Sequence, residues 1–464
     1  MLTYSMEERG RMPLYDYLSR RIKADIWAGT LKPGERLPSK RALARNLEVS
    51  VATVEHAYAQ LVAEGYLYAK EKSGYYVSPL ETQARPPVRP EPQPTEPEPQ
   101  SWLLDLKGEG SGTEGFPFAV WARLLRRVIS DEGERLLRVS PHSGVEELRR
   151  AIVGYLRQFR GVEADPAQVV VGAGTEYLYN LIVQLLGRER VYGVEVPGYP
   201  KAGKIYALNG ARCVGLELDS QGVRVEQLEQ KGVQVVHVSP SHQFPSGVVT
   251  PVARRQSLLR WAAEGEGRYI IEDDYDSEFR FTGRPIPTLQ SIDRGERVIY
   301  MNTFSRTLAP SLRISYMVLP RGLLEQYQQK LGFYSCTVPA MEQFTLARFL
   351  SQGSFETHVN RMRVFYRARR DQVLSALEDS PLAGRYQVRG EDAGLHFLVR
   401  LDTRLPDAAL RSRAAEQGVR LALLSDYYSA RSSAPQHIVV VNYSGIDLER
   451  LPEGLRRLAQ AWEE

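Results

Sequence analysis

A run of prolines divides this chain into two parts that must fold separately. Between Glu81 and Gln100 the sequence reads ETQARPPVRPEPQPTEPEPQ, and seven of these twenty residues are proline. Proline lacks the amide hydrogen and fixes φ, so neither a helix nor a central strand can form here. We expect a semi-rigid polyproline II linker, roughly 60 Å long if fully extended at about 3.1 Å per residue. Because globular sequence lies on both sides, a functionless tail is the weaker interpretation. The predicted division is a domain at 11–79, a linker at 80–102 and a domain at 103–464.

Cysteine content and hydropathy exclude several classes of protein. Cys213 and Cys336 are the only cysteines, too few for a disulfide framework or a structural zinc site. The N-terminal sequence has no apolar stretch of the kind found in secretory signals. No run of about 18 uncharged apolar residues is present to span a membrane. We therefore expect a cytoplasmic protein with no membrane partner.

The small positive charge of the chain is concentrated before the linker. The net charge of the chain is +4, and residues 1–80 hold twelve Lys and Arg against nine Asp and Glu, which gives +3. This asymmetry weakly favours an N-terminal part that faces nucleic acid.

Three helical patterns and a hairpin precede the linker. Apolar residues recur every four positions from Leu14 to Ile26 and predict a helix that ends at Gly29. Ser39 and Ser50 are placed to cap two further helices. The apolar residues expected on the inner faces of these two helices are Leu43, Leu47, Val54, Tyr58 and Leu61. The segment 66–78 reads as a hairpin with Gly74 near its turn. This order of elements is typical of a winged helix-turn-helix.

Polar and basic residues of this predicted domain are placed to contact DNA. In a helix-turn-helix the second helix enters the major groove, and its N-terminal residues meet base edges and phosphates. Here that helix begins at Ser50, and exposed amides at a helix start favour phosphate. The candidate contacts at the helix starts and on the wing are Arg36, Ser39, Lys40, Arg41, Ser50, Thr53, Lys70, Lys72 and Ser73. For any single one of them, an ordinary solvated side chain is the alternative.

The run PGERLPSKRALARNLEVSVATVEHAYAQLVAEGYL closely resembles the DNA-binding domain of GntR-type bacterial transcription regulators. The resemblance covers roughly residues 11–79 and implies double-stranded operator DNA as a partner. By this resemblance Arg36, Lys40, Arg41 and Thr53 are DNA contacts, and Gly74 lies at the tip of the wing.

After the linker, short apolar strands alternate with helices. The expected strands are QVVVGAG (168–174), RVYGVEVPG (190–198), QVVHVSP (234–240), RYIIEDDYD (268–276), RVIYMNTFS (297–305) and ISYMVLP (314–320). Continuous Val and Ile without polar alternation predict an α/β fold, a mainly parallel sheet with helices on both faces. The last hundred residues look like a smaller α/β subdomain, with LHFLVRL (395–401) and HIVVVNY (437–443) as candidate strands.

Short motifs at the ends of these strands carry the chemistry of a binding site. GAGTEYL (172–178) turns from a strand into a helix, where free amides bind phosphate. VPGYP (196–200) presents Tyr199, which can stack on a planar ring. EDDYD (272–276) supplies a carboxylate that can keep a pyridine nitrogen protonated. Ser305 and Arg313 suit a phosphate group, through a hydroxyl donor and a charge-assisted fork.

Two other interpretations of these residues are weaker. Asp273, Asp274 and Asp276 resemble metal ligands, but no His or Glu with metal-ligand spacing accompanies them in the sequence. We therefore predict no metal site. His242 has no Ser or Cys partner in a nucleophile turn, so we interpret it as a pocket-lining or structural residue.

Taken together, the strand-end motifs resemble fold-type I pyridoxal-phosphate enzymes of the aspartate aminotransferase group. Joined to a GntR-type domain, the chain resembles MocR/GabR-type transcription regulators from about residue 11 to its end. The resemblance implies a head-to-tail, domain-swapped homodimer and pyridoxal 5'-phosphate as cofactor. It assigns the phosphate to Gly174, Thr175, Ser305 and Arg313, ring stacking to Tyr199, the pyridine nitrogen to Asp273 and the ring hydroxyl to Tyr275.

Arg306 stands where these enzymes carry the lysine that binds the cofactor covalently. A Schiff base needs an amine that can lose its proton, and a guanidinium stays protonated at physiological pH. None of the chain's ten lysines follows Ser305; Lys201 and Lys204 come closest to the pocket motifs. We predict no catalytic residue and no transaminase turnover. Any pyridoxal phosphate binds without a covalent bond or as a preformed external aldimine, or Arg306 grips a different anion.

The ligand of this site stays open at the level of the sequence. Aminotransferases usually offer an arginine to the substrate carboxylate near the C-terminal strand, where HIVVVNYSGI (437–446) has valines. Arg431 is a possible substitute, or a surface charge. We predict a regulator that binds operator DNA at two half-sites and senses a small-molecule effector. The alternatives are a working aminotransferase with an added DNA-binding domain, and a DNA-binding scaffold whose large domain only dimerises.

Overall fold

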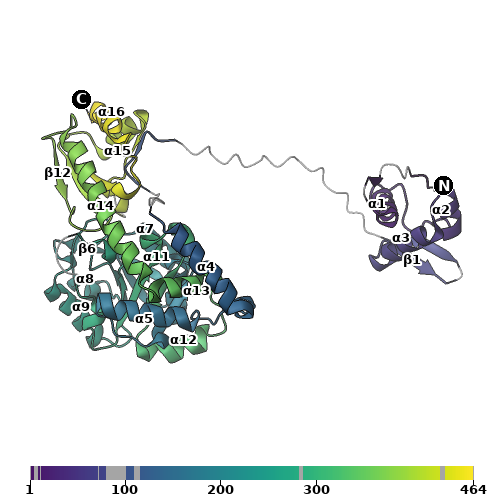
Figure 1. Cartoon of the computed structure of the whole chain (residues 1–464), viewed down its shortest axis with the longest axis horizontal. Helices are drawn as coiled ribbons and strands as arrows, with labels where there is room; N and C mark the ends of the chain where they lie inside the picture. Colours follow the sequence, from purple (N-terminus) through teal and green to yellow (C-terminus); the bar gives the residue numbers. More distant parts are fainter. Residues whose placement is uncertain are drawn as a thin grey trace. The chain divides into compact units, whose positions relative to one another are not determined.

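The computed structural model describes residues 2–4, 9–10, 12–71, 73–79, 101–108, 115–281, 286–428 and 434–462. The chain forms two compact units, Met1–Gln100 and Ser101–Glu464 (Figure 1). Apart from Ser101 and Trp102, the linker predicted at 80–102 lies outside the described residues. Within the described ranges, no helix is long and apolar enough to cross a membrane.

The first unit is a helix-turn-helix with a two-stranded wing, as predicted. Its elements are α1 (Leu14–Trp27), α2 (Lys40–Asn46), α3 (Val51–Ala63), β1 (Leu67–Lys70) and β2 (Gly74–Val77), and the two strands pair antiparallel. The apolar residues expected on the inner faces of α2 and α3 are all buried, and they form one core with Leu18, Ile22 and Ile26 of α1. Helical periodicity in this segment therefore reports the true core.

The second unit contains most of the helices and strands. Its strands are β3 (Leu104–Asp105), β4 (Val169–Gly172), β5 (Val191–Val196), β6 (Arg212–Asp219), β7 (Gly222–Val223), β8 (Val235–Val238), β9 (Tyr269–Asp273), β10 (Val298–Thr303), β11 (Ser315–Val318), β12 (Tyr386–Arg389), β13 (His396–Leu401), β14 (Val419–Arg420) and β15 (Ile438–Asn442). Its α-helices are α4 (Phe118–Glu132), α5 (Glu146–Arg160), α6 (Thr175–Leu186), α7 (Pro200–Leu208), α8 (Glu226–Gln230), α9 (Val252–Glu264), α10 (Leu289–Ile292), α11 (Phe304–Thr307), α12 (Leu324–Leu331), α13 (Ala340–Ser351), α14 (Ser354–Glu378), α15 (Asp407–Glu416) and α16 (Leu451–Trp462).

The large sheet has the strand order β4-β11-β10-β9-β8-β5-β6-β7. The five strands from β10 to β6 run parallel, which confirms a mainly parallel sheet. Strand β11 runs antiparallel to both of its neighbours, and β7 runs antiparallel to β6. A continuous apolar run reads the same in either direction, so the sequence does not distinguish β11 from its parallel neighbours.

Alternate side chains of the sheet enter two different cores. Val170, Ile271 and Met317 pack on one face with α6, α7 and α12. Val171 and Tyr316 pack on the other face with α4, α5 and α13. Successive residues of a strand point to opposite faces, so uniformly apolar strands require helices on both.

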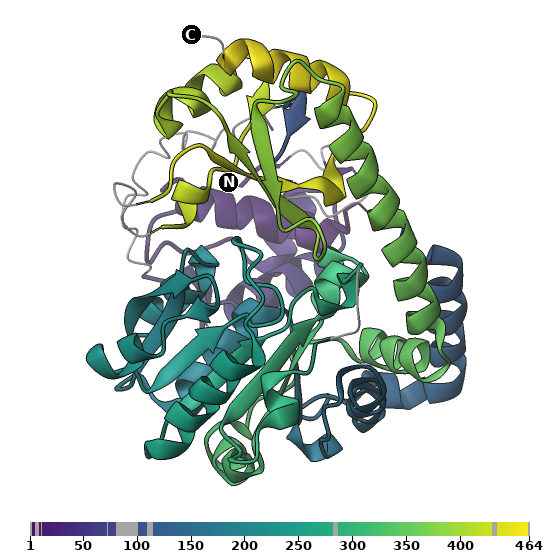
Figure 2. The ribbon, with the colours of Figure 1, turned by 90° about the vertical axis from the view of Figure 1, so that its left-hand side faces the viewer.

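A smaller subdomain follows at the C-terminal end. The three-stranded antiparallel sheet β12-β13-β15 has its own core with α14, α15 and α16. The 25-residue helix α14 runs from the large sheet's side to this subdomain (Figures 1 and 2). A short parallel pair between β3 and β14 ties the start of the second unit to the same subdomain. Both candidate C-terminal strands are therefore confirmed.

A buried ion pair fixes α5 to the end of β9. Arg160 Nη2 lies 2.7 Å from Asp274 Oδ2, and both side chains are buried. The same carboxylate oxygen accepts hydrogen bonds from Tyr300 (2.7 Å) and Ser277 (2.8 Å). Removing one partner of a buried pair leaves an uncompensated charge, which costs far more than the pair itself contributes.

Arg160→Met should destabilise the second unit by about 3–5 kcal/mol, because Asp274 keeps its charge but loses its counter-ion. The matched control is Arg150→Met, which breaks an exposed pair with Glu146 whose side chains are 69% and 58% accessible. We expect less than about 0.5 kcal/mol there. Urea unfolding of both variants measures the difference, and equal losses would contradict a structural role for the buried pair.

Candidate functional site

The two helix starts of the first unit have the caps that the sequence predicts. Ser39 Oγ accepts a hydrogen bond from the Ala42 amide (3.2 Å), and Ser50 Oγ accepts one from the Thr53 amide (3.1 Å). The hydroxyls of Ser50 and Thr53 also share a hydrogen bond of 2.8 Å. The start of α3 is therefore fixed, with its small side chains largely exposed.

Basic residues surround this helix start. Arg36 and Arg41 are exposed, whereas Lys40 forms an ion pair with Glu55 of α3 (2.5 Å). Glu55 was not predictable from the sequence, because the pair joins residues on two helices. Lys40 is thus partly neutralised before any DNA arrives.

The wing differs in detail from the prediction. Gly74 begins β2 and pairs with Lys70, so the turn itself lies before it. Gly74 has a φ of +122°, and a Cβ there would lie 3.5 Å from Arg36 Nε. Lys70 Nζ stacks 4.9 Å from the ring centre of Tyr76, and Ser73 shares a hydrogen bond with the same tyrosine (2.6 Å). Lys72, also predicted to contact DNA, lies outside the described residues.

The strand-end motifs of the second unit surround one cavity of about 260 Å³. The carboxyl ends of parallel strands lie at the same edge of a sheet, where α/β folds bind ligands. The predicted residues that line the cavity are Thr175, Tyr199, Asp273, Tyr275, Ser305, Arg306 and Arg313. Gly174 lies directly behind it, because a Cβ at that position would come within 2.4 Å of Arg313 Nη2. The structure thus brings all eight predicted residues together.

Asp273 is held at the floor of this cavity with one oxygen unused. Its Oδ2 accepts a hydrogen bond of 2.7 Å from the Tyr179 hydroxyl and lies 3.4 Å from His237 Nε2. Burial, reinforced by Asp273, raises the pKa of Tyr179 well above its usual value, so the phenol stays a donor. Oδ1 of Asp273 is buried and has no hydrogen-bond partner among the residues that the structure describes. This oxygen fits a ligand that donates a hydrogen, such as a protonated pyridine nitrogen.

The opposite end of the cavity suits a phosphate. Thr175 begins α6, where the first backbone amides lack partners within the helix. Arg313 reaches this helix start from a left-handed backbone conformation (φ +50°). Glu176 was not among the predicted site residues. Its Oε2 lies 3.7 Å from Arg313 Nη2, and its Oε1 lies 2.7 Å from Lys201 Nζ. An arriving phosphate would therefore share these two cations with Glu176.

Arg306 lies on α11 between these two ends. It is half-buried, and within the described parts of the chain it makes no hydrogen bond or ion pair. A cation without a partner in a ligand-sized cavity is free to bind an anionic group. Lys204 does not line the cavity, whereas Lys201 does.

Tyr199 and Tyr275 form part of the cavity wall. Tyr199 is 41% exposed and packs edge-on against Phe244, with ring centres 6.4 Å apart. Tyr275 is half-buried, and its hydroxyl lies 3.4 Å from His242 Nδ1. His242 itself is buried and does not line this cavity. Arg431, the suggested carboxylate anchor, lies outside the described residues.

Glu195 is a second acid of the cavity that the sequence did not reveal. It accepts hydrogen bonds from the Ser239 amide (3.3 Å) and Gln243 Nε2 (3.2 Å), but no cation pairs with it in the described chain. Burial raises the pKa of Glu195 to about 8. The carboxyl is therefore largely protonated at neutral pH.

Glu195→Gln should stabilise the protein increasingly as the pH rises from about 5 to 8, with no further gain above that. The wild-type acid has a higher pKa folded than unfolded, so ionisation above its unfolded pKa destabilises the fold. Melting temperatures of both proteins across this range measure the effect. A difference that does not change with pH would show that Glu195 titrates normally.

Comparisons with known proteins agree with this architecture. Residues 14–77 match the family described as "Bacterial regulatory proteins, gntR family", and residues 108–437 match "Aminotransferase class I and II". The HTH-type transcriptional regulator YdeL of Bacillus subtilis is 39% identical, with 97% of each chain covered. The probable rhizopine catabolism regulatory protein MocR of Rhizobium meliloti is 34% identical over 97% of this chain and 94% of that protein.

A solved structure resembles the second unit closely. The kynurenine aminotransferase of Pyrococcus horikoshii, in complex with PMP, KYN and KYA, has a TM-score of 0.69 and 27% identity. The similarity covers 78% of this chain and 91% of that one. The predicted fold class, a helix-turn-helix joined to a fold-type I aminotransferase domain, is confirmed. A GntR-type DNA-binding domain, an aminotransferase-like domain and relatives that match both together show that this chain belongs to the MocR-type helix-turn-helix transcription regulators.

Proposed function

We propose that this regulator binds pyridoxal phosphate, free or joined to an amino compound, as a non-covalent ligand. Binding of this ligand controls the affinity of the protein for operator DNA. The observation that carries the proposal is the contrast between Asp273 and Arg306. Asp273 has an unused buried oxygen that suits a pyridine nitrogen, whereas Arg306 lines the same cavity at the position where the family resemblance leads us to expect the cofactor-binding lysine. When bound, pyridoxal phosphate supplies an aldehyde and an electron-withdrawing ring.

Each part of such a ligand has a matching group in the cavity. Asp273 accepts from the ring nitrogen, and Tyr275 donates to the ring hydroxyl. Tyr199 covers the ring face. Gly174, Thr175, Ser305 and Arg313 hold the phosphate through amides, a hydroxyl and a guanidinium. The likeness to an aminotransferase seen with PMP supports this arrangement.

No described side chain of the cavity is suited to bind the aldehyde covalently. The guanidinium of Arg306 stays protonated at any physiological pH. Lys201 is the only lysine among the lining residues that the structure describes, and its hydrogen bond to Glu176 raises its pKa. An amine held as an ammonium ion is not a nucleophile. Transaminase turnover should therefore be absent.

In this proposal the first unit binds the operator DNA. Arg36, Lys40, Arg41 and Lys72 supply positive charge for phosphates, while Ser39, Ser50, Thr53 and Gly74 permit close approach of the backbone to DNA. A head-to-tail homodimer would present two such units to two half-sites. Ligand binding shifts the DNA-binding equilibrium only by the difference in ligand affinity between the two arrangements.

Arg306→Lys should convert non-covalent binding into covalent binding, because an amine then stands at the cofactor's aldehyde. With the wild type, we expect bound pyridoxal phosphate to leave on dialysis and borohydride to attach none of it to the protein. With Arg306→Lys, absorbance near the internal-aldimine region should survive dialysis, and borohydride should fix one cofactor per chain, visible in the intact mass.

Lys201→Met is the matched control for this experiment. It removes the other cavity lysine and should leave the wild-type result unchanged. Covalent cofactor on the wild type that disappears in Lys201→Met would show that Lys201 replaces the missing lysine. If the wild type converts amino acids to keto acids, the alternative of a working aminotransferase with an added DNA-binding domain is supported instead.

Arg41→Ala should weaken binding to duplex DNA at every sequence alike, because a phosphate contact carries no base information. We expect the slope of log affinity against log salt to fall in magnitude by about 1. Fluorescence anisotropy with a duplex selected from a random pool by the wild-type chain measures both quantities. Arg20→Ala, which removes an exposed arginine of α1 paired with Asp16, is the control and should change neither.

A further inference from the structure

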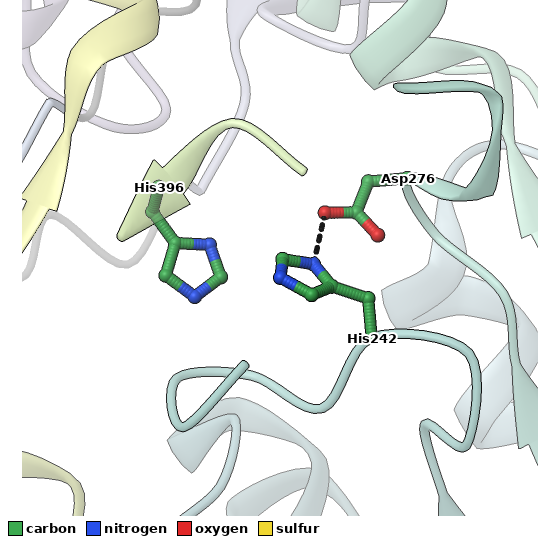
Figure 3. Close-up of side chains that lie close together, drawn as sticks. All are labelled: His242, Asp276 and His396. Carbon is green, nitrogen blue, oxygen red and sulfur yellow. Dashed lines mark hydrogen bonds and ion pairs between the residues drawn. The ribbon is translucent and has the colours of Figure 1, made fainter. Parts of the chain in front are cut away.

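Three buried side chains gather beside the cavity and take no part in the proposed cofactor contacts. His242 follows β8, Asp276 precedes the 3-10 turn Ser277–Phe279, and His396 begins β13. Their exposed fractions are only 4%, 3% and 4%. One nitrogen or oxygen of each lies within 4.8 Å of those of the others. Figure 3 shows the three side chains pointing toward one another from three separate segments.

Hydrogen bonds determine which nitrogen of each imidazole carries the hydrogen. His242 Nδ1 lies 2.8 Å from Asp276 Oδ2, and a carboxylate accepts, so Nδ1 is the donor. His396 Nε2 lies 3.1 Å from the Pro245 carbonyl oxygen, which can only accept. The lone pairs therefore remain on His242 Nε2 and His396 Nδ1.

Neither lone pair finds a donor in the described chain. His242 Nε2 is buried with no hydrogen-bond partner. The hydrogen bond of His396 among the described residues involves its other nitrogen, Nε2, and the two imidazole rings lie 4.9 Å apart between centres. A buried acceptor without a donor is costly, so the unpaired Nε2 of His242 favours an electron-poor species beside it.

We propose that His242 and His396 bind one divalent transition-metal ion, with Asp276 orienting His242 from behind. Neutral imidazole is a preferred ligand of zinc, copper and nickel. A carboxylate that accepts from the far nitrogen of a metal-bound histidine is the usual support of such a ligand. Zinc–imidazole bonds are about 2.0–2.1 Å long, so one ion can join two ligand nitrogens that lie roughly 4 Å apart or closer.

Space and charge around the cluster favour moderate affinity. His242 and Asp276 line a small cavity of about 20 Å³, enough for a water molecule that could complete the coordination. Arg160 and Arg280 line the same cavity, and Asp274 neutralises Arg160. The positive charge of Arg280, together with that of Arg306, which also acts on His396, opposes a cation, so we expect micromolar rather than nanomolar binding.

Zinc binding by the full chain tests this site. Tag-free protein, stripped with a chelator and free of pyridoxal phosphate, is dialysed against Zn²⁺ and analysed for bound metal. We expect one zinc per chain, with apparent affinity at least about tenfold weaker in His242→Gln and in His396→Gln. Asp276→Asn should weaken it about 10- to 100-fold, the range for loss of a supporting carboxylate.

The control is His358→Gln, which removes another buried histidine, one that hydrogen-bonds the Thr307 carbonyl (2.7 Å) outside the cluster. It should bind zinc like the wild type. If the cluster variants fail to fold, wild-type protein loaded with Cu²⁺ still tests the site. Its electron paramagnetic resonance spectrum should show coupling to two nitrogens. Absence of stoichiometric zinc on the wild type, unchanged affinity in both histidine variants, or a copper spectrum without nitrogen coupling would each overturn the proposal.

Discussion

The site depends on a buried carboxylate that the protein itself leaves half satisfied. Tyr179 and His237 hold one oxygen of Asp273, and the other oxygen has no donor in the described parts of the chain. A buried polar atom left unpaired costs about 1–3 kcal/mol. That cost is recovered only when a ligand brings its own donor, so the cavity is prepared for a group such as a protonated pyridine. The parallel strands also bring the proposed phosphate-binding groups to the same cavity.

Arg306 changes what this prepared site can do. With a lysine there, the same surroundings would support covalent catalysis; with a guanidinium, they support binding. In the proposed site, an arginine at the lysine position keeps a positive charge in the cavity but supplies no reactive amine. Glu176 adds to this effect, since it holds the remaining lysine of the cavity wall as an ammonium ion. Binding without turnover is what a sensor domain requires.

Local sequence patterns predicted the helices and strands of this protein better than they predicted contacts between residues far apart in the sequence. Strand-end motifs predicted the cavity residues because parallel strands bring their ends to one edge. Helix caps were predictable because Ser39 and Ser50 act on residues three positions away. The antiparallel direction of β11 was not predictable, because a strand buried on both faces carries no sequence pattern that indicates its direction.

The missed residues share a different property. Asp273 takes its donors from Tyr179 and His237, which are 94 and 36 positions away. His242 and His396 come from segments of the second unit that lie far apart in the sequence, so no spacing rule connects them. The prediction of no metal site rested on short-range spacing alone. Glu55 and Glu176 are acids on helix faces, where only the fold decides which cation they meet.

If the cavity senses the ligand for the DNA-binding helices, ligand binding in the cavity and DNA binding by the first unit must be coupled. The most direct measurement is the affinity of the full chain for its selected duplex, with and without pyridoxal phosphate, in the wild type and in Asp273→Ala. We expect a change in affinity of at least several-fold in the wild type and none in the variant. Equal DNA affinity of the wild type with and without the ligand, despite saturation of the cavity, would contradict it and leave the second unit as a dimerisation scaffold.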